Sequence, residues 1–221
     1  MKRTRSTTTE NDDNIVALTP NFKSWYRTFK YDSSLVNDNE VDRLWMLHPE
    51  EHAKIMMYGK LVPVPRWQQT YGTQSYKFSG VENTAIPIPP ELQVYMDYAN
   101  TTCKPYFKHF TTKSFNMMFL NWYNDGNHYI GAHSDDERQI VKNKNGETLI
   151  FSLSFGATRE FVFEPREKDI DYKISLDLSH CSALLMGGLC QKTHKHTVPK
   201  IKGKKATVAG RRINMTFRMF K

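Results

Sequence analysis

The sequence predicts an α+β fold in which short strands form a β-sandwich or barrel. Helical periodicity is confined to two segments in the first half of the chain, residues 35–52 and 91–106. Beyond residue 115 the apolar pattern changes to a period of two, and turn sequences separate the alternating segments. Many short strands with helices concentrated before them are typical of an α+β protein with a sandwich or barrel at its centre.

The first predicted helix is short and amphipathic, with its apolar side formed by Val41, Leu44, Trp45 and Leu47. A second helix is expected after the proline cluster at residues 87–90, because proline suits the first turn of a helix better than its interior.

Five segments alternate as strands do. They are residues 115–123, 149–155, 160–165, 183–186 and 213–219. The turn signals between them are Asn124-Asp125-Gly126, Asn145-Gly146 and Gly187-Gly188.

The length of 221 residues suits one domain, which we place at residues 15–221. Residues 1–14 are too polar to bury, and we expect a disordered tail there. The N-terminus has no apolar leader and the chain has no apolar run long enough to span a membrane, so no membrane partner is expected. Three cysteines without paired spacing indicate a reducing, intracellular compartment.

The charge of the chain is +8, and it is unevenly placed. The last thirty residues contain ten Lys or Arg and no Asp or Glu. Such a segment is compatible with a phosphate-bearing partner, and equally with a solvated face or tail.

Candidate metal ligands lie before and after the predicted strands at residues 149–155, 160–165 and 183–186. His133 and Asp135 are two residues apart, so on a strand they would project from the same face. His194 and His196 follow downstream. Two histidines and one carboxylate form the facial arrangement of non-haem Fe(II) oxygenases, which leaves coordination positions open. A zinc site of Cys190 with His194 and His196 is the alternative, although it lacks a fourth ligand.

The last predicted strand carries polar side chains on one face. Arg212, Asn214, Thr216 and Arg218 alternate with apolar residues. Two arginines directed into a barrel require an anion, and a carboxylate matches the guanidinium geometry. Asn121 and Tyr123 share a face of an earlier strand and offer further donors. The alternative is an edge strand with arginines exposed to solvent.

These motifs together resemble the AlkB family. NWYNDGNHYIGAHSDDE resembles the family's N-x-Y-x-D-G…I-G-x-H-x-D-D-E block, and RRINMTFR resembles R-x-N-x-T-F-R. SLSFGATREFVF is similar to the strand pair that follows the metal segment. The resemblance covers about residues 55–220 and implies a double-stranded β-helix (jelly-roll) core. Helices would pack on one side, and a nucleotide-recognition hairpin region would lie toward the N-terminus.

The resemblance also implies the site. Iron would be bound by His133, Asp135 and His196, with His196 preferred to His194 because KHTVP matches the family pattern, although Lys195 replaces its usual aromatic residue. The 2-oxoglutarate cofactor would be held by a larger group, with Arg218 on the distal carboxylate. That group is Asn121, Tyr123, Arg212, Asn214 and Arg218.

The implied activity is oxidative dealkylation of N-alkylated DNA bases, with O2 as co-substrate and formaldehyde, succinate and CO2 as products. The partner would be duplex DNA with a flipped base, bound by a monomer, and a nuclear location fits. The implied substrate contacts are Tyr58 at a hairpin tip, Arg66, Tyr76, Phe78, Asp136, Glu137, Lys202, Lys204 and Lys205. The same chemistry on RNA or a protein side chain, or a non-enzymatic nucleic-acid-binding module, are the alternatives.

Overall fold

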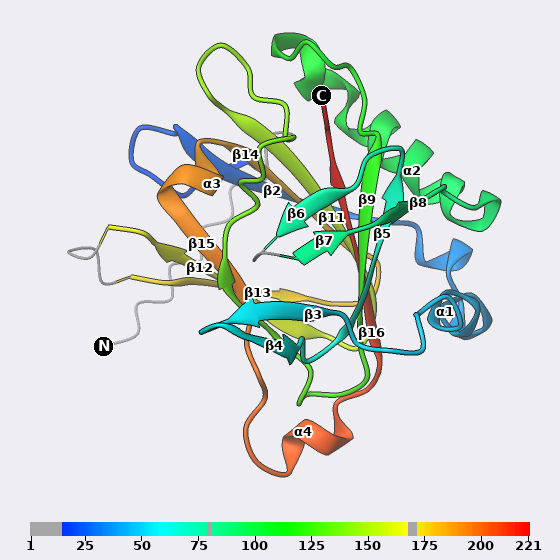
Figure 1. The fold of residues 1–221 in the computed structure, drawn as a ribbon. Helices are drawn as coiled ribbons and strands as arrows, with labels where there is room; N and C mark the ends of the chain where they lie inside the picture. The colour runs from blue at the N-terminus through cyan, green and yellow to red at the C-terminus, as the bar shows by residue number, and fades with distance from the viewer. Residues whose placement is uncertain (1–14, 79–80, 168–171) are drawn as a thin grey trace.

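The computed structural model of the chain describes residues 15–78, 81–167 and 172–221 (Figure 1). The tail expected at residues 1–14 lies outside these ranges.

The strands are β1 (Ile15–Ala17), β2 (Ser24–Lys30), β3 (Lys54–Met57), β4 (Lys60–Pro63), β5 (Trp67–Gly72), β6 (Tyr76–Phe78), β7 (Val81–Asn83), β8 (Ala85–Ile86), β9 (Met117–Tyr123), β10 (Ile130–His133), β11 (Thr148–Gly156), β12 (Arg159–Pro165), β13 (Ile174–Leu178), β14 (Ser182–Gly188), β15 (His194–Val198) and β16 (Arg212–Arg218). The helices are α1 (Asp38–Trp45), α2 (Pro90–Cys103), α3 (Cys190–Thr193) and α4 (Lys205–Val208), with 3₁₀ turns η1 (Ser33–Leu35) and η2 (Lys104–His109).

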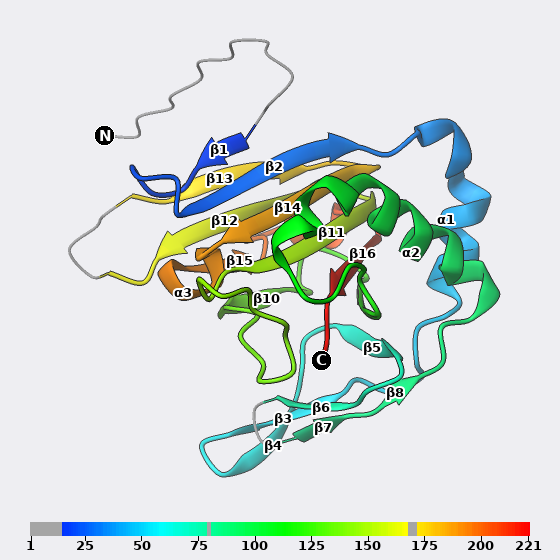
Figure 2. The same cartoon turned by 90° about the horizontal axis from the view of Figure 1, so that it is seen from above.

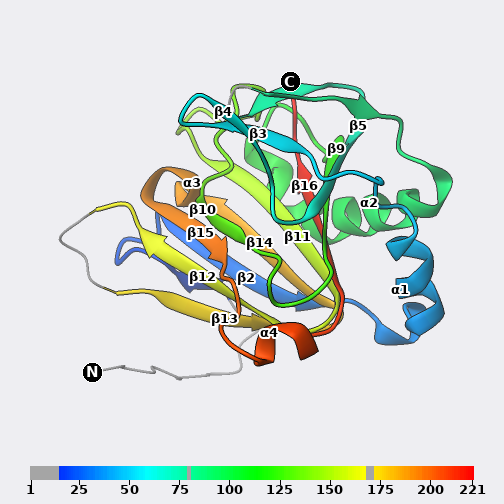
Figure 3. The same cartoon turned by 60° about the horizontal axis from the view of Figure 1, so that its bottom comes forward.

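Two sheets form the core of the molecule. The larger has the order β1-β2-β14-β11-β16-β9-β5-β8, and the smaller has the order β10-β15-β12-β13. Figure 3 shows the smaller sheet in front of the larger one. Apolar side chains fill the space between them, including Phe119, Ile150, Phe163 and Leu184. The predicted jelly-roll core is therefore confirmed.

Strand β16 lies inside the larger sheet, paired with β11 on one side and β9 on the other. Its residues Ile213, Met215 and Phe217 are buried in the cluster that α2 covers. Because side chains alternate along a strand, Arg212 and Arg218 point the opposite way, toward the smaller sheet. All seven residues of β16 are buried, so the alternative of an exposed edge strand is wrong.

The two predicted helices exist and are shorter than the segments that predicted them. Helix α1 begins after Asn37, whose side chain accepts a hydrogen bond from the Glu40 amide at 3.1 Å. Helix α2 begins at Pro90 and gives way to η2 at Lys104. Both helices pack on the outer side of the larger sheet, as expected (Figure 2). Among the residues described, no helix is long and apolar enough to cross a membrane.

The five alternating segments correspond to β9, β11, β12, β14 and β16, which confirms the strand predictions. The sequence did not predict β1 and β2, although β2 pairs with β14 along its whole length. Upstream of β9, the hairpins β3–β4 and β6–β7 stand beside one another outside the two large sheets (Figure 2). Strand β5 joins this region to the core by pairing with β9.

The turn from β11 to β12 generates a stability prediction. Gly156 has a φ of +84°, and a β-carbon there would collide with the main-chain carbonyl of Arg211. Gly156→Ala should therefore destabilise the protein by about 1–3 kcal/mol, measured as a lower midpoint in thermal or urea unfolding. Gly210→Ala is the matched control, because a β-carbon there meets only Ala157 at 3.6 Å. Equal midpoints for the two variants would contradict the prediction.

Candidate metal centre and anion pocket

Pairing between β10 and β15 brings two histidines together. His133 is the last residue of β10 and lies directly opposite His196 of β15. Opposed residues of an antiparallel pair have their β-carbons about 5 Å apart. The sequence argument placed His133 and Asp135 on one strand face, and this is wrong in detail. Strand β10 ends at His133, so Asp135 reaches the histidines from the loop that follows.

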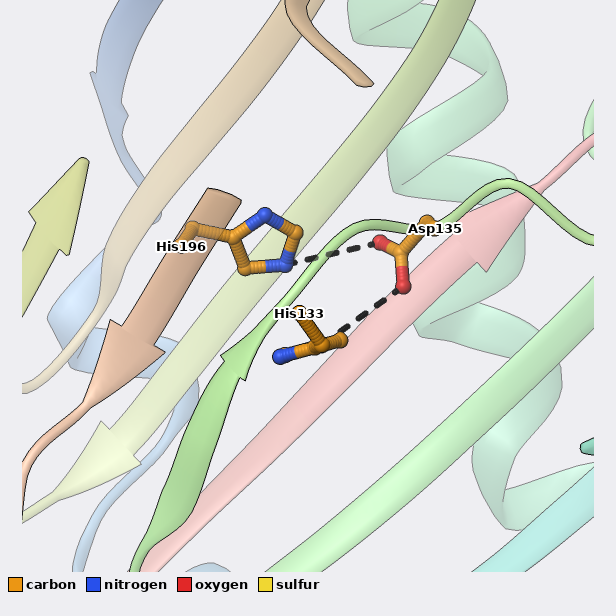
Figure 4. A group of neighbouring side chains, drawn as sticks. All are labelled: His133, Asp135 and His196. Atoms are coloured by element: carbon orange, nitrogen blue, oxygen red, sulfur yellow. Dashed lines mark ion pairs between the residues drawn. The ribbon is translucent and has the colours of Figure 1, made fainter. Parts of the chain in front are cut away.

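The three side chains converge on one point (Figure 4). The Nε2 atoms of His133 and His196 each lie 3.8 Å from a carboxylate oxygen of Asp135. The three possible ligand atoms all lie within 4.8 Å of one another, and no other such group occurs among the described residues. Neither Cys190 nor His194 belongs to it. The zinc alternative therefore has no support in the geometry.

Neighbouring groups fix the orientation of these ligands. The Nδ1 atom of His133 lies 2.9 Å from the carbonyl of Gly131, and the Asp135 amide donates to Gln191 Oε1 at 2.9 Å. The ring of His196 stacks on Phe161 with a centroid separation of 5.3 Å. Partners of this kind hold metal ligands in place before the ion binds.

The protonation states suit a cation. Burial, followed by the neighbouring His133, lowers the pKa of His196 to about 3, and burial also lowers the pKa of His133. Both imidazoles are therefore neutral at neutral pH, as metal ligation requires. Burial alone would raise the pKa of Asp135, but Arg218, His196 and His133 together lower it. The carboxylate is consequently ionised.

Arg218 is committed to the two acidic residues next to it. Its Nη2 donates to Asp135 Oδ1 at 2.6 Å and its Nη1 donates to Glu137 Oε1 at 3.0 Å. The side chain of Glu137, an implied substrate contact, is only 6% exposed and lies inside the site beside Arg218. Arg218 therefore faces the metal ligands, and two carboxylates already match its charge, although its Nε lacks an acceptor among the described residues.

Arg212 lies at the other end of β16, and its charge has no carboxylate partner among the described residues. It is fully buried, and only its Nη2 atom has a partner, the Ser154 hydroxyl at 2.9 Å. Its Nε and Nη1 atoms lack a hydrogen-bond acceptor within the described structure. Tyr123 lies directly opposite on β9, with its ring centroid 5.1 Å from the guanidinium. A buried guanidinium with two free donors is a site for a carboxylate.

One cavity connects the metal ligands to Arg212. It is lined by Phe119, Asn121, Tyr123, Ile130, His133, Asp135, Ser152, Phe161, Met186, His196, Val198, Arg212, Asn214, Thr216 and Arg218. Its volume of about 30 Å³ is small beside the ~300–1,000 Å³ of typical ligand pockets. A dicarboxylate therefore fits only if lining side chains move outward when it binds.

Two of the expected cofactor residues lie between these ends of the cavity. Asn214 pairs with Asn121 across β16 and β9, and its amide donates to Ser152 Oγ at 2.8 Å. The Asn121 side chain accepts a hydrogen bond from Arg66 Nε at 2.6 Å. Arg66, expected to touch the substrate, is thus buried behind the cavity and orients Asn121.

The remaining expected substrate residues are distributed around this cavity. Tyr76 is buried, with its ring centroid 5.9 Å from the Arg218 guanidinium. Phe78 ends β6, and its side chain lies outside what the structure describes. Asp136 is exposed and pairs with Arg166 at 3.3 Å. Three lysines, Lys202, Lys204 and Lys205, occupy an exposed loop at the start of α4.

Comparison with known protein families shows to which superfamily the chain belongs. The profile of the 2OG-Fe(II) oxygenase superfamily matches residues 26–218, which include the three candidate ligands and both buried arginines. The chain belongs to this superfamily. Its triad and the free donors of Arg212 fit Fe(II) and 2-oxoglutarate, respectively, because they supply a facial ligand set and a buried cation for a carboxylate.

Curated relatives are about one-third identical to the chain over the aligned region. The mouse DNA oxidative demethylase ALKBH2 is 36% identical over 75% of the chain and 66% of its own length, and the human protein is 35% identical over 75% and 60%. The rat alkB homolog 3 dioxygenase is 34% identical over 71% and 50%. The chain thus spans roughly half to two thirds of these relatives. The solved structure of OsALKBH1 superposes with a TM-score of 0.54 at 18% identity, covering 93% of this chain and 99% of its own, and supports the fold.

The two downstream histidines provide a direct test of the metal site. His196→Ala should abolish tight Fe(II) binding, because it removes one of only three ligands. His194→Ala should retain it, because the ring of His194 contacts Thr193 and Phe163 instead. Calorimetric titration of anaerobic protein with Fe(II) measures both. The reverse ranking would move the third ligand to His194.

The two arginines should respond differently to replacement by lysine. Arg212→Lys removes the planar pair of donors, so the affinity for 2-oxoglutarate should fall about tenfold, equivalent to ~1.4 kcal/mol, with Fe(II) binding retained. Arg218→Lys disturbs the support of Asp135 and should weaken Fe(II) binding about 10–100-fold. Titrations of each variant with metal and with cofactor separate these effects. A loss of cofactor affinity confined to Arg218→Lys would place the distal carboxylate at Arg218, as the resemblance implies.

Proposed function

We propose that the chain removes alkyl groups oxidatively from N-alkylated DNA bases such as 1-methyladenine and 3-methylcytosine. The iron and 2-oxoglutarate would supply the oxidising chemistry with O2, and the products would be formaldehyde, succinate and CO2. The names of the curated relatives support a DNA substrate. A reducing intracellular compartment, the nucleus among them, suits Fe(II) chemistry on DNA.

The hairpin β3–β4 is the observation that carries the DNA proposal. Tyr58 and Gly59 form its two-residue turn, and both have positive φ, +48° and +76°. Glycine and asparagine are the favoured residues in such a turn, whereas a tyrosine there is conformationally costly. The Tyr58 side chain is nevertheless 98% exposed. It therefore does not pack against Trp67 or Tyr71, and the fold gains no burial from it.

The hairpin presents other apolar side chains as well. Met56, Met57, Leu61 and Val62 are all at least one-third exposed. Apolar wedges on proteins that distort DNA enter between base pairs and repay part of the unstacking cost. An aromatic ring that replaces an extruded base adds stacking of about 1–3 kcal/mol. A base must leave the helix before it can reach a buried iron, so a wedge and this site belong together.

Within the site, different residues would bind the cofactor, orient a metal ligand and contact the substrate. Arg212, with Tyr123 and Ser154 beside it, would bind the distal carboxylate of 2-oxoglutarate. Arg218 holds Asp135 in the orientation that ligation needs. Asp136, 61% exposed and paired with Arg166 at 3.3 Å, would contact a cationic base only by exchanging that partner. The loop with Lys202, Lys204 and Lys205 would contact phosphates without reading sequence.

The assay is release of formaldehyde and succinate from methylated single-stranded DNA, duplex DNA and RNA of one sequence. We expect wild-type protein to act on DNA. Tyr58→Ala should lower the rate on the duplex by about five- to a hundredfold and change the single-strand rate much less, because only a duplex has a stack to repair.

Phe22→Ala is the matched control for the hairpin variant. Phe22 is also an exposed aromatic residue with positive φ, in the turn between β1 and β2. Its replacement should leave both rates unchanged. Equal losses on duplex and single strand for Tyr58→Ala would reject the wedge, and turnover of RNA alone would move the substrate class to RNA.

A further inference from the structure

A second hollow opens beside the metal ligands, outside the cavity described above. Its volume is about 290 Å³, roughly ten times the ~30 Å³ share of one water molecule. It is lined by Asp135, Asp136, Lys142, Gly146, Thr148, Arg166, Gly188, Leu189, Gln191 and Lys192. These residues come from the loop after β10, the ends of β12 and β14, the start of β11, and α3. The hollow therefore lies at the end of the barrel where β10 delivers His133.

The charge in this hollow is predominantly positive once the ion pairs are assigned. Arg166 pairs with Asp136, and Asp135 pairs with Arg218. Lys142 and Lys192 remain, and the side chains of both are exposed and make no hydrogen bond or ion pair with any described residue. Lys142, Arg166 and Lys192 together exceed the two aspartates of the lining by one charge, so the hollow is net positive and can attract an anion.

The loop that carries Lys142 is held in a defined shape. Asn143 Oδ1 accepts hydrogen bonds from the amides of Asn145 and Glu147, at 2.9 and 3.0 Å. Gly146 has a φ of +76°, and the Nζ atom of Lys192 lies 2.6 Å from where its β-carbon would be. The absence of a side chain at this position therefore gives the ammonium of Lys192 its place beside the loop.

The position of the hollow relative to the metal indicates what the anion is. Lys192 lies in α3, two residues before β15, His196 lies within that strand, and the loop with Lys202, Lys204 and Lys205 follows it. Even a fully extended chain spans at most about 14 Å from Lys192 to His196 and about 22 Å from His196 to Lys202, so cationic groups lie within that reach on either side of the metal ligand. The segment after β10 passes between α3 and the β6–β7 hairpin (Figure 1). A nucleic-acid strand whose base occupies the iron site would thus meet cationic side chains on both the 5′ and the 3′ side of that base.

We propose that Lys142 and Lys192 form a subsite for a backbone phosphate of the nucleic-acid strand that carries the flipped base. The proposal rests on the proposed function and adds a specific contact to it. The phosphate would lie on the α3 side of the base, across the metal from the Lys202–Lys205 loop. The contact is to the backbone, so it would hold the strand in register without selecting a sequence.

The test is binding of a fluorescent single-stranded oligonucleotide, methylated or unmethylated, to enzyme loaded with Fe(II) and 2-oxoglutarate under nitrogen. For Lys142→Gln/Lys192→Gln, the dissociation constant should rise about tenfold near physiological salt. The slope of log K against log salt should fall in magnitude by about one. The control, Lys108→Gln/Lys144→Gln, removes two exposed lysines that do not line the hollow and should match wild type.

Neutral methylphosphonate linkages then locate the contact. Placed one at a time beside the methylated base, a single linkage should weaken binding to wild type, and that linkage should cause no further loss in the double variant. Unchanged thermal midpoints show that the variants remain folded. A wild-type salt slope in the double variant, or an equal fall in the control, overturns the subsite.

The binding readout separates this inference from the proposed activity. If wild-type protein binds DNA but releases no formaldehyde, a reduced slope in the double variant still supports the phosphate subsite while the demethylation proposal fails. If demethylation occurs and the slope does not change, the activity stands and the subsite fails. If wild-type protein binds no DNA, both proposals fail.

Discussion

The ion pair between Arg218 and Asp135 is the interaction on which the site depends. It joins the last residue of β16 to the loop after β10, two segments from different sheets, at 2.6 Å and fully buried. Asp135 would be costly to bury ionised without it, and breaking such a pair on one side costs about 3–5 kcal/mol. The pair keeps the carboxylate charged beside two neutral histidines, which is the state in which the three residues can bind a cation.

At the other end of β16, Arg212 is a buried arginine without a carboxylate partner among the described residues. Arg212 is as deeply buried as Arg218, yet two of its donors have no acceptor in the described structure. Along one face of β16, Asn214 and Thr216 thus separate an arginine with two carboxylate partners from one with none among the described residues. The energetic cost of Arg212 is explained if the chain retains it for an anion that is not part of the protein. This contrast assigns the metal end and the carboxylate end of the cavity.

Outside the barrel, the hairpin β3–β4 and the hollow at α3 show residues that contribute little to the fold. Tyr58 occupies a turn conformation that disfavours it and is exposed to solvent. Lys142 and Lys192 line a hollow and make no ion pair with any described residue. Burial and packing explain neither arrangement, whereas a strand of nucleic acid with one base extruded accounts for both. The metal site, the hairpin and the phosphate subsite would then act on the same ligand.

The sequence by itself determined the core strands and the composition of the site. Alternation in the last predicted strand placed two arginines on one face, and residue types indicated two histidines and a carboxylate, with the choice of His196 over His194 resting on the family resemblance. Strands β1 and β2 escaped prediction because they are short or carry mixed patterns, and pairing with β14 stabilises β2. Only the tertiary structure decided which arginine pairs with acidic residues of the protein and which keeps two donors free for the carboxylate of a ligand. Both arginines lie on the same strand face, and their difference arises from Asp135 and Glu137, which chain folding brings to Arg218 and not to Arg212.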